Sequence, residues 1–285
     1  MKKEETKGNT AGGFETATGE VPFPLTNDYL FKVLMQKDER VLRSIISAVL
    51  LMKEEEIESV HIENPIIPGE KINDKDVMVD VRVTMNKGVI LDLEMQVARH
   101  EYWPARSIYY AARNLSNLQK GEDYEKVMPV YQVGFLDFQP FKGEKVFRSE
   151  NKLMDTKTHR LYTDLLTVIT VVMPQNDIAS HEDKEYNLDG WAKLFKARTW
   201  EEARAMAENN TALYEAAETM YTISEDQRIR DQLEAREDRL RMERYYKRHF
   251  AEFEKQHEED TRLIEEMRNE IAMLKAELAG IKDDK

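Results

Sequence analysis

Asp80, Glu94 and Gln96 are the residues whose types and spacing most suggest chemistry. They lie within residues 77–97, where two runs alternate between apolar and polar side chains on either side of Asn86-Lys87-Gly88. Period-two alternation around a short loop that contains Gly predicts a β-hairpin. In such a hairpin the two carboxyl groups and the amide share one face of the sheet.

The register of this hairpin decides which acids face each other. If Met85 pairs with Val89 across the loop, Asp80 lies opposite Glu94. Two carboxylates in that position repel each other, but a bound Mg²⁺ would reverse the sign because it prefers carboxylate oxygens. The residues therefore allow a metal site on a sheet face, and they equally allow the exposed polar face of a surface hairpin.

Several motifs in a fixed order resemble the PD-(D/E)XK nuclease superfamily, and within it the transposase-like recombination-promoting nucleases (Rpn). The resemblance covers residues 24–138. The residues that carry it are Thr26-Asn27-Asp28-Tyr29-Leu30-Phe31-Lys32, Asp80-Val81-Arg82, Leu93-Glu94-Met95-Gln96, Arg106-x-x-x-Tyr110, Gly121-x-x-Tyr124 and Pro129-Val130.

The resemblance implies an α/β restriction-endonuclease-like core, with a mixed central sheet flanked by helices. It also implies metal-dependent hydrolysis of DNA phosphodiesters and a role in recombination. Asp80, Glu94 and Gln96 would be catalytic, with Asp80 and Glu94 on Mg²⁺ or another divalent cation. Gln96 stands where the superfamily usually has Lys, although Gln is typical of this branch. Lys can stabilise negative charge near the attacking water, whereas Gln can only form a hydrogen bond.

Further candidates are less specific. Asp28 lies where the first helix of the superfamily often supplies a third metal-binding acid, and it equally suits the first turn of a helix electrostatically. Arg106, Tyr110 and Arg113 share one helical face and could hold the DNA backbone, or form a solvated face. Lys32 is a fourth candidate for DNA contact; it could approach the site or simply lie on the surface.

Composition limits the class of protein. The chain has 285 residues, of which 41% are hydrophobic and 34% charged, and it contains no Cys. Thiol catalysis, disulfides and Cys-ligated zinc are therefore excluded, and a reducing cytoplasm is compatible. We find neither a signal peptide nor an apolar run long enough to span a membrane. The net charge is −13, and the excess acids lie mostly after residue 160.

The elements expected around the hairpin follow from helical and strand periodicity. Helices are predicted after Pro24, with Thr26 or Asn27 as N-cap, from about Asp38, and from Pro104 to about Gln119. The last of these would bury Ile108, Ala112, Leu115 and Leu118. Strands are predicted over 127–138 and 165–173, a capped helix over 199–221, and one long charged helix from Asp226.

The end of the long helix carries heptads. Phe250, His257, Ile264, Ile271 and Leu278 fall seven apart, and Phe253, Asp260, Met267, Leu274 and Ile281 follow with an offset of three. This pattern predicts a coiled coil, and we expect a homo-oligomer, although the helix could also fold back on its own domain. The expected organisation is a disordered tail (1–20), a nuclease-like domain (21–198), a helical region (199–249) and a coiled coil (250–285).

Two functions are open at this level. The first is a Mg²⁺-dependent DNA endonuclease of the recombination-promoting or transposase-like type. The alternative is a non-catalytic, domesticated nuclease fold that acts as a coiled-coil interaction or DNA-binding module. The absence of Lys at position 96 and the heptads motivate the alternative.

Overall fold

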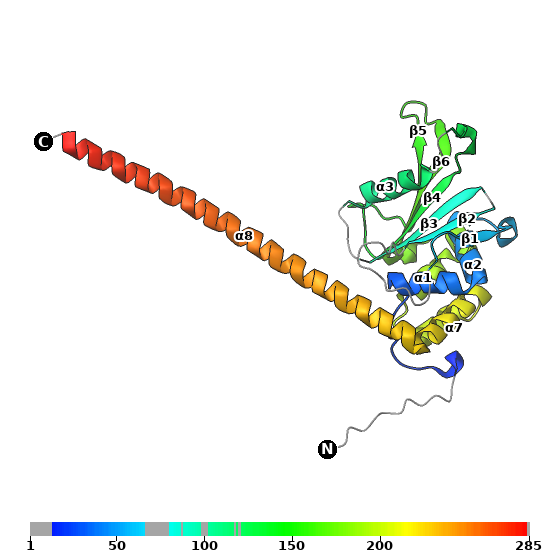
Figure 1. Ribbon diagram of the computed structural model, residues 1–285. Coiled ribbons are helices and arrows are strands. Elements are labelled where there is room, and N and C mark those ends of the chain that lie inside the picture. Colours follow the sequence, from blue (N-terminus) through cyan, green and yellow to red (C-terminus); the bar gives the residue numbers. More distant parts are fainter. Residues whose placement is uncertain are drawn as a thin grey trace, which may run out of the picture. The chain divides into compact units, whose positions relative to one another are not determined.

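A mixed six-stranded sheet forms the centre of the fold (Figure 1). The computed structural model describes residues 13–65, 80–86, 88–97, 102–116, 118 and 121–283. The strand order is β1-β2-β3-β4-β6-β5. The strands are β1 Val60–Ile62, β2 Val81–Met85, β3 Val89–Gln96, β4 Val130–Leu136, β5 Arg148–Met154 and β6 Leu161–Val172. The expected α/β core is confirmed; β1 and β5, which the periodicity did not predict, are its edge strands.

The β2–β3 hairpin has the predicted register. Met85 pairs with Val89, and Val81 pairs with Leu93. Asp80 directly precedes β2, so the same register continued by one residue leads to Glu94. The turn is tied down by Asn86, whose side chain accepts a hydrogen bond from the Glu58 N–H at 2.8 Å.

Strands β3, β4 and β6 run parallel and form the buried middle of the sheet. Their register places Glu94, Gly134 and Thr170 side by side on one face. Helix α3 (Trp103–Leu115) covers that face, and α1 (Asp28–Lys37), α2 (Glu39–Leu50) and α5 (Leu188–Lys196) lie toward the other (Figure 1). Phe31 of α1, Phe135 of β4 and Phe195 of α5 form an aromatic cluster on that other side, with ring centroids 5.2 to 5.9 Å apart.

Helix capping follows the sequence closely. The Asn27 side chain accepts hydrogen bonds from the first turn of α1, and the Asp38 side chain does the same for α2. The Thr199–Glu202 capping box opens α6 (Trp200–Ala207). A single helix to residue 221 was expected, but Asn210 caps a new helix, α7 (Thr211–Glu225).

Helix α3 presents only part of the predicted face to the sheet. Its buried residues are Trp103, Ser107, Ala111 and Asn114; Ile108 is 49% exposed, and Ala112 is also exposed. The prediction took the larger apolar side chains as the buried set. Around Glu94 the strands beneath α3 instead carry polar side chains and a glycine, so small and polar residues fit there. Farther along the helix, Ala111 and the partly buried Leu115 pack on an apolar cluster of Ile90, Val130, Leu166 and Val168.

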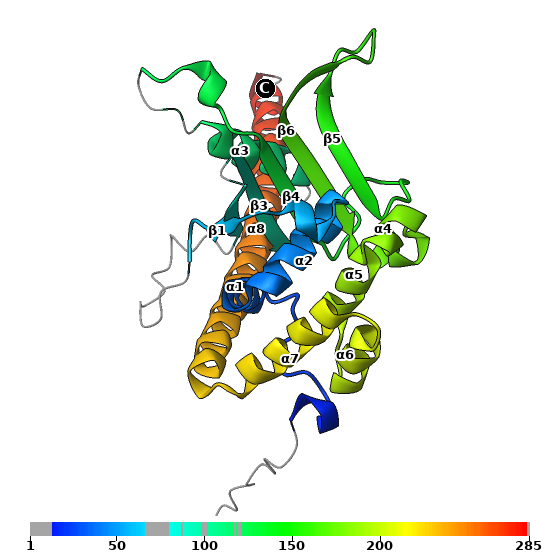
Figure 2. The ribbon, with the colours of Figure 1, turned by 90° about the vertical axis from the view of Figure 1, so that its right-hand side faces the viewer.

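The domain boundaries also differ from those expected. Phe14, in a 3₁₀ turn at Phe14–Thr16, is buried against Trp200 and Tyr214, so the disordered tail is wrong for these residues, while residues 1–12 lie outside the described part. Helices α4 (His181–Glu185) to α7 belong to the same compact unit as the sheet (Figure 2). No domain boundary therefore falls at residue 198.

Helix α8 (Gln227–Asp283) confirms the long charged helix expected from residue 226. Contacts divide the chain into one unit of residues 1–229 and a second of residues 230–285. Within the described residues, no helix combines the length and apolar character needed to cross a bilayer.

Candidate active site

Three acids gather where β2 begins and along β3. Asp92 and Glu94 point to the face of the sheet that α3 covers, and they are only 1% and 7% exposed. Asp80 is half-buried. Because the side chains of a strand alternate, the hairpin register brings Asp80 to the same face. Three carboxyl groups thus share one largely dry corner of the sheet.

Asp80 and Asp92 form the tightest pair in this group. Burial raises the pKa of Asp92 well above its ordinary value, and the charge of Asp80 raises it further. Oδ2 of Asp80 and Oδ1 of Asp92 are both buried without a hydrogen-bond donor. A hydrogen bond between the two carboxyl groups therefore requires a proton on one of them. The raised pKa of Asp92 favours Asp92 as the group that holds this proton.

Helix α3 supplies a partner for each buried acid of β3. Asn114 donates from Nδ2 to Oδ2 of Asp92 at 2.9 Å. Arg106 donates from Nε and Nη2 to Oε1 of Glu94 at 2.8 and 2.6 Å. Burial raises the pKa of Glu94, while Arg106 opposes the rise and Asp80 and Asp28 add to it. The Arg106 guanidinium also stacks on the Tyr110 ring, 4.9 Å from its centroid.

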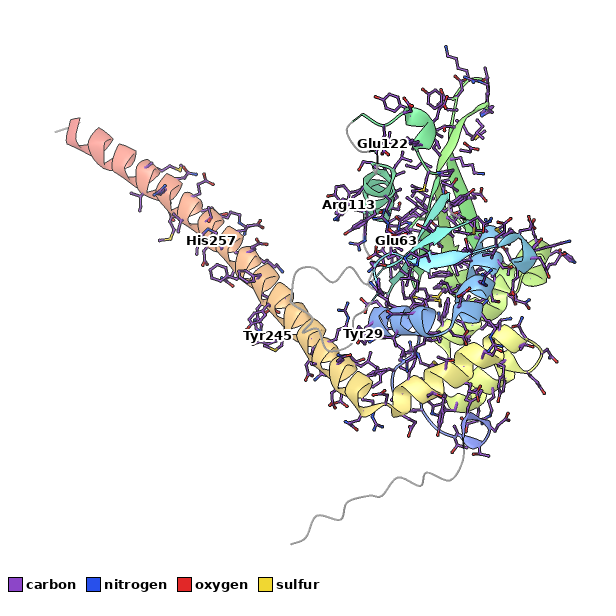
Figure 3. All side chains as sticks on the ribbon, turned by 45° about the vertical axis from the view of Figure 1, so that its right-hand side comes forward. Tyr29, Glu63, Arg113, Glu122, Tyr245 and His257 are labelled. Carbon is purple, nitrogen blue, oxygen red and sulfur yellow. The ribbon has the colours of Figure 1, made fainter. Side chains whose placement is uncertain are left out.

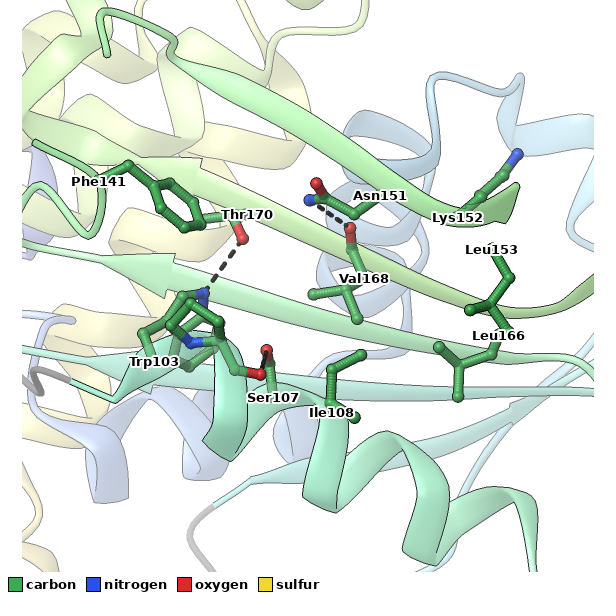
Figure 4. A pocket seen from close by; sticks show the side chains of 11 residues that line it. Trp103, Ser107, Ile108, Phe141, Asn151, Lys152, Leu153, Leu166, Val168 and Thr170 are labelled. Carbon is green, nitrogen blue, oxygen red and sulfur yellow. Dashed lines mark hydrogen bonds between the residues drawn. The ribbon is translucent and has the colours of Figure 1, made fainter. Parts of the chain in front are cut away.

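Close approach of α3 to the sheet depends on Gly134. A Cβ at this position would overlap the Trp103 ring. Trp103 is buried, and its indole N–H donates to Thr170 Oγ1 at 3.2 Å (Figure 4). Since Gly134 is next to Glu94 in the sheet, this packing fixes the first turn of α3 beside that acid.

Helix α1 contributes a buried cation. Lys32 is only 3% exposed. Burial lowers its pKa, and the charges of Asp80 and Asp92 act in the opposite direction. An ammonium group at this place offsets part of the negative charge of the three acids. Asp28, at the first turn of the same helix, is near enough to act on Glu94.

Residues 25–249 match the PD-(D/E)XK nuclease family transposases. The chain belongs to that family. The match extends well past the residues that carried the resemblance in the sequence, through α7 and into α8. Searches of curated proteins and of solved structures found no match. Membership supports a nuclease- or transposase-like function that acts on DNA, and nucleases of this family generally use divalent metal ions.

The structure brings together most of the predicted site residues of this family member. Asp80 and Asp28 interact electrostatically with Glu94, and Lys32 interacts with Asp80. Arg106 pairs with Glu94, and Tyr110 contacts Arg106. Gln96 is the last residue of β3 and is half-buried. Arg113 is exposed on α3 (Figure 3). Lys32 is not a surface residue, so the surface alternative is wrong, and its ammonium group lies near the acids, as the other alternative expected.

Two members of the site were missed as candidates. Asp92 has the same strand parity as Glu94, and that parity was the available signal. No signal in the sequence indicated Asn114, because its contact with Asp92 depends on how α3 packs on the sheet. Among the described residues, no three His, Cys, Asp or Glu side chains converge in a ready-made metal cage. In this arrangement Glu94 is held by Arg106 instead.

A pocket of about 200 Å³ opens on the other side of α3 from Glu94. Trp103, Ser107 and Ile108 form one wall, and side chains of β5 and β6 form the opposite wall (Figure 4). Its lining is mostly apolar, with Asn151 and Lys152 at the β5 side. The acids are not part of it.

Proposed function

We propose that this protein is a divalent-metal-dependent DNA endonuclease of the transposase-like type, with Mg²⁺ as the first candidate metal. The single observation that carries the proposal is the pair of buried carboxyl oxygens on Asp80 and Asp92, which face each other and which no other donor among the described residues reaches. Burying unpartnered acids costs free energy, and a hard cation is the partner that such oxygens prefer. Family membership supplies the reaction class.

Asp80 and Glu94 would hold the metal, with Asp92 beside them and Asp28 as a further acid. The chemistry that a bound divalent cation supplies is polarisation of the scissile phosphate and activation of a water. Gln96, at the end of β3, would orient that water with its amide. Lys32 would provide the positive charge that Gln96 lacks, because its ammonium group already interacts electrostatically with Asp80 and Asp92.

Arg106 connects the metal to DNA in this proposal. Its guanidinium now neutralises Glu94. A cation on Glu94 would compete for the same oxygen and release Arg106 toward a phosphate, for which its geometry is well suited. Tyr110 would keep the released guanidinium in place by stacking, and Arg113 would add charge along the same helix.

The proposal includes self-association through the heptads of α8. These residues repeat apolar side chains every three or four positions, which is the pattern of a coiled-coil seam. The alternative function, a non-catalytic interaction or DNA-binding module, is favoured by one observation, the Arg106–Glu94 ion pair. A guanidinium that stayed on Glu94 would leave the site without one of its metal ligands.

Nicking of supercoiled plasmid by the pure protein tests the proposal. We expect nicking with Mg²⁺ or Mn²⁺, none in chelator, and none from Asp80→Ala, whose fold should be intact or slightly stabilised because a repulsion is removed. Asp164→Ala, at an exposed position of β6, is the matched control and should nick normally.

A second measurement is independent of catalysis. Mg²⁺ should raise the melting temperature of the wild type and of Asp164→Ala, but not that of Asp80→Ala. Nicking by Asp80→Ala equal to that of the wild type would refute the site. Binding of DNA without nicking under any metal would establish the non-catalytic alternative.

A further inference from the structure

Helix α8 carries a stripe of exposed apolar side chains interrupted by two polar ones. We call it the α8 seam. Its apolar members are between 48% and 70% exposed, and His257 is exposed as well. The seam consists of Tyr246, Phe250, Phe253, His257, Asp260, Ile264, Met267 and Ile271.

We propose that the α8 seam is covered by a second copy of this chain, and that the two helices run antiparallel. The inference rests on the self-association proposed above and not on the nuclease chemistry. The observation that sets the direction is the position of His257 and Asp260 at the middle of the seam. They occupy successive a and d positions of the heptad.

The apolar side chains do not distinguish the two directions. In a parallel pair in register, each seam residue faces its own equivalent. In an antiparallel pair centred between His257 and Asp260, each a position faces a d position. Both arrangements bury the same apolar residues; the antiparallel contacts would be Phe253 with Ile264, Phe250 with Met267, and Tyr246 with Ile271.

The two polar positions do distinguish the directions. In a parallel pair Asp260 faces Asp260 of the partner subunit, and two carboxylates meet in a partly dry seam. In the antiparallel pair His257 faces Asp260 of the partner subunit, and this contact occurs twice by symmetry. An imidazole N–H donates to a carboxylate in either protonation state of the ring. Charge complementarity therefore favours the antiparallel direction.

Neighbouring contacts on the same helix leave both polar side chains able to bond outward. Asp260 accepts from Gln256 at 3.1 Å, and a carboxylate has further acceptor capacity. The His257 ring stacks on Phe253, with centroids 6.5 Å apart. Because each copy continues from residue 229 into the start of its own α8, an antiparallel pair would join its two nuclease units to opposite ends of the coil.

Disulfide trapping in the full-length chain tests the direction without background, because the sequence has no Cys. Ile264→Cys and Phe253→Cys are made separately, one with a small tag that changes its mass. They are mixed, unfolded, refolded together and oxidised. In the antiparallel pair Cys at 264 faces Cys at 253, within the short Cα separation that a disulfide needs.

We expect disulfides between the two variants to exceed those within either variant at least tenfold. A mixture of Phe250→Cys and Met267→Cys should give the same excess of disulfides between variants. This second pair shows whether the substitutions of the first pair have themselves weakened the seam. Glu258→Cys, at an exposed position outside the seam, gives the level of random collision.

Each other outcome overturns the inference in a recognisable way. Disulfides within Ile264→Cys alone would show a parallel pair. A dimer mass by light scattering with no trapping from either mixture would place the interface elsewhere. A monomer mass for the wild type would refute the proposed self-association, and the seam would then be covered by another protein or by the chain's own domain. The nuclease proposal would not be affected.

Discussion

Replacing Asp92 with Asn should make the metal-free protein more stable. The change removes an acid that is 1% exposed and lies against Asp80. It keeps the shape of the side chain, and the new amide oxygen can still accept from Asn114. The stabilisation comes from removing the cost of burying an acid and the repulsion by Asp80, which raise the pKa of Asp92 in the folded protein and are absent from the unfolded chain.

The magnitude follows from proton linkage. An unfolded Asp has a pKa of about 3.9, and each unit between that value and the solution pH costs about 1.4 kcal/mol if the folded state keeps its proton. Asp92 would then cost the fold at most about 4 kcal/mol at pH 7, and less at pH 5, because that pH is only about one unit above the unfolded pKa. The sign is fixed by the raised pKa of the folded state, so the stability loss grows as pH rises until Asp92 ionises.

Urea unfolding in chelator at pH 5 and pH 7 measures this effect. We expect the free energy of unfolding of Asp92→Asn to be larger than that of the wild type at both pH values, with the larger difference at pH 7. Asp164→Asn, an exposed strand position, controls for loss of a carboxylate. A variant less stable than the wild type at pH 7, or a gain that does not grow with pH, would refute the buried, protonated state of Asp92.

The remaining predictions concern the other parts of the site and the helix. Lys32→Met should slow nicking by about 100-fold or more, because it removes a cation from the reacting charge, and it should not weaken the Mg²⁺-dependent rise in melting temperature; an unchanged rate would contradict this. Gln96→Lys should need more Mg²⁺ for half-maximal nicking, since a unit charge pair at roughly 4 Å interacts by about 4 kcal/mol at an effective dielectric of 20, and an unchanged requirement in a Mg²⁺ titration would place Gln96 away from the metal. Truncation before Phe250 should lower the oligomeric state and leave the core folded, whereas equal light-scattering masses, after allowance for the deletion, would argue against the seam.

The hairpin could be predicted from the sequence because its information is local. Alternation and loop length set the register, and the pairing of Met85 with Val89 follows from them. The helix starts at residues 28, 39 and 200 were equally accessible, since a capping side chain acts on backbone groups within its own turn. These features need no knowledge of what packs on them.

Features set by tertiary packing were out of reach. The face of α3 that meets the sheet is set by the polar surface around Glu94 and by Gly134, which is far along the chain from Trp103 at the start of the helix. The edge strands β1 and β5 carry exposed or half-buried residues, so neither shows a clear apolar period. The position of Lys32 also depends on tertiary packing, because nothing in the neighbouring sequence indicates that its ammonium group lies near acids.

Each of the three acids is stabilised by a different kind of partner. Asp92 is met by a neutral donor from Asn114 and by a proton, Glu94 by the Arg106 guanidinium, and Asp80 by the nearby Lys32 ammonium group. Each of these partners costs less than an unpaired buried charge, but Oδ2 of Asp80 and Oδ1 of Asp92 are reached by no other donor in the described part of the chain and depend on the one proton held between the two carboxyl groups. A structural network would be expected to satisfy every buried oxygen, because a partly satisfied one destabilises the fold. The acids of this sheet therefore make physical sense as a binding site whose partners are exchanged, and Arg106 is the partner best placed to leave.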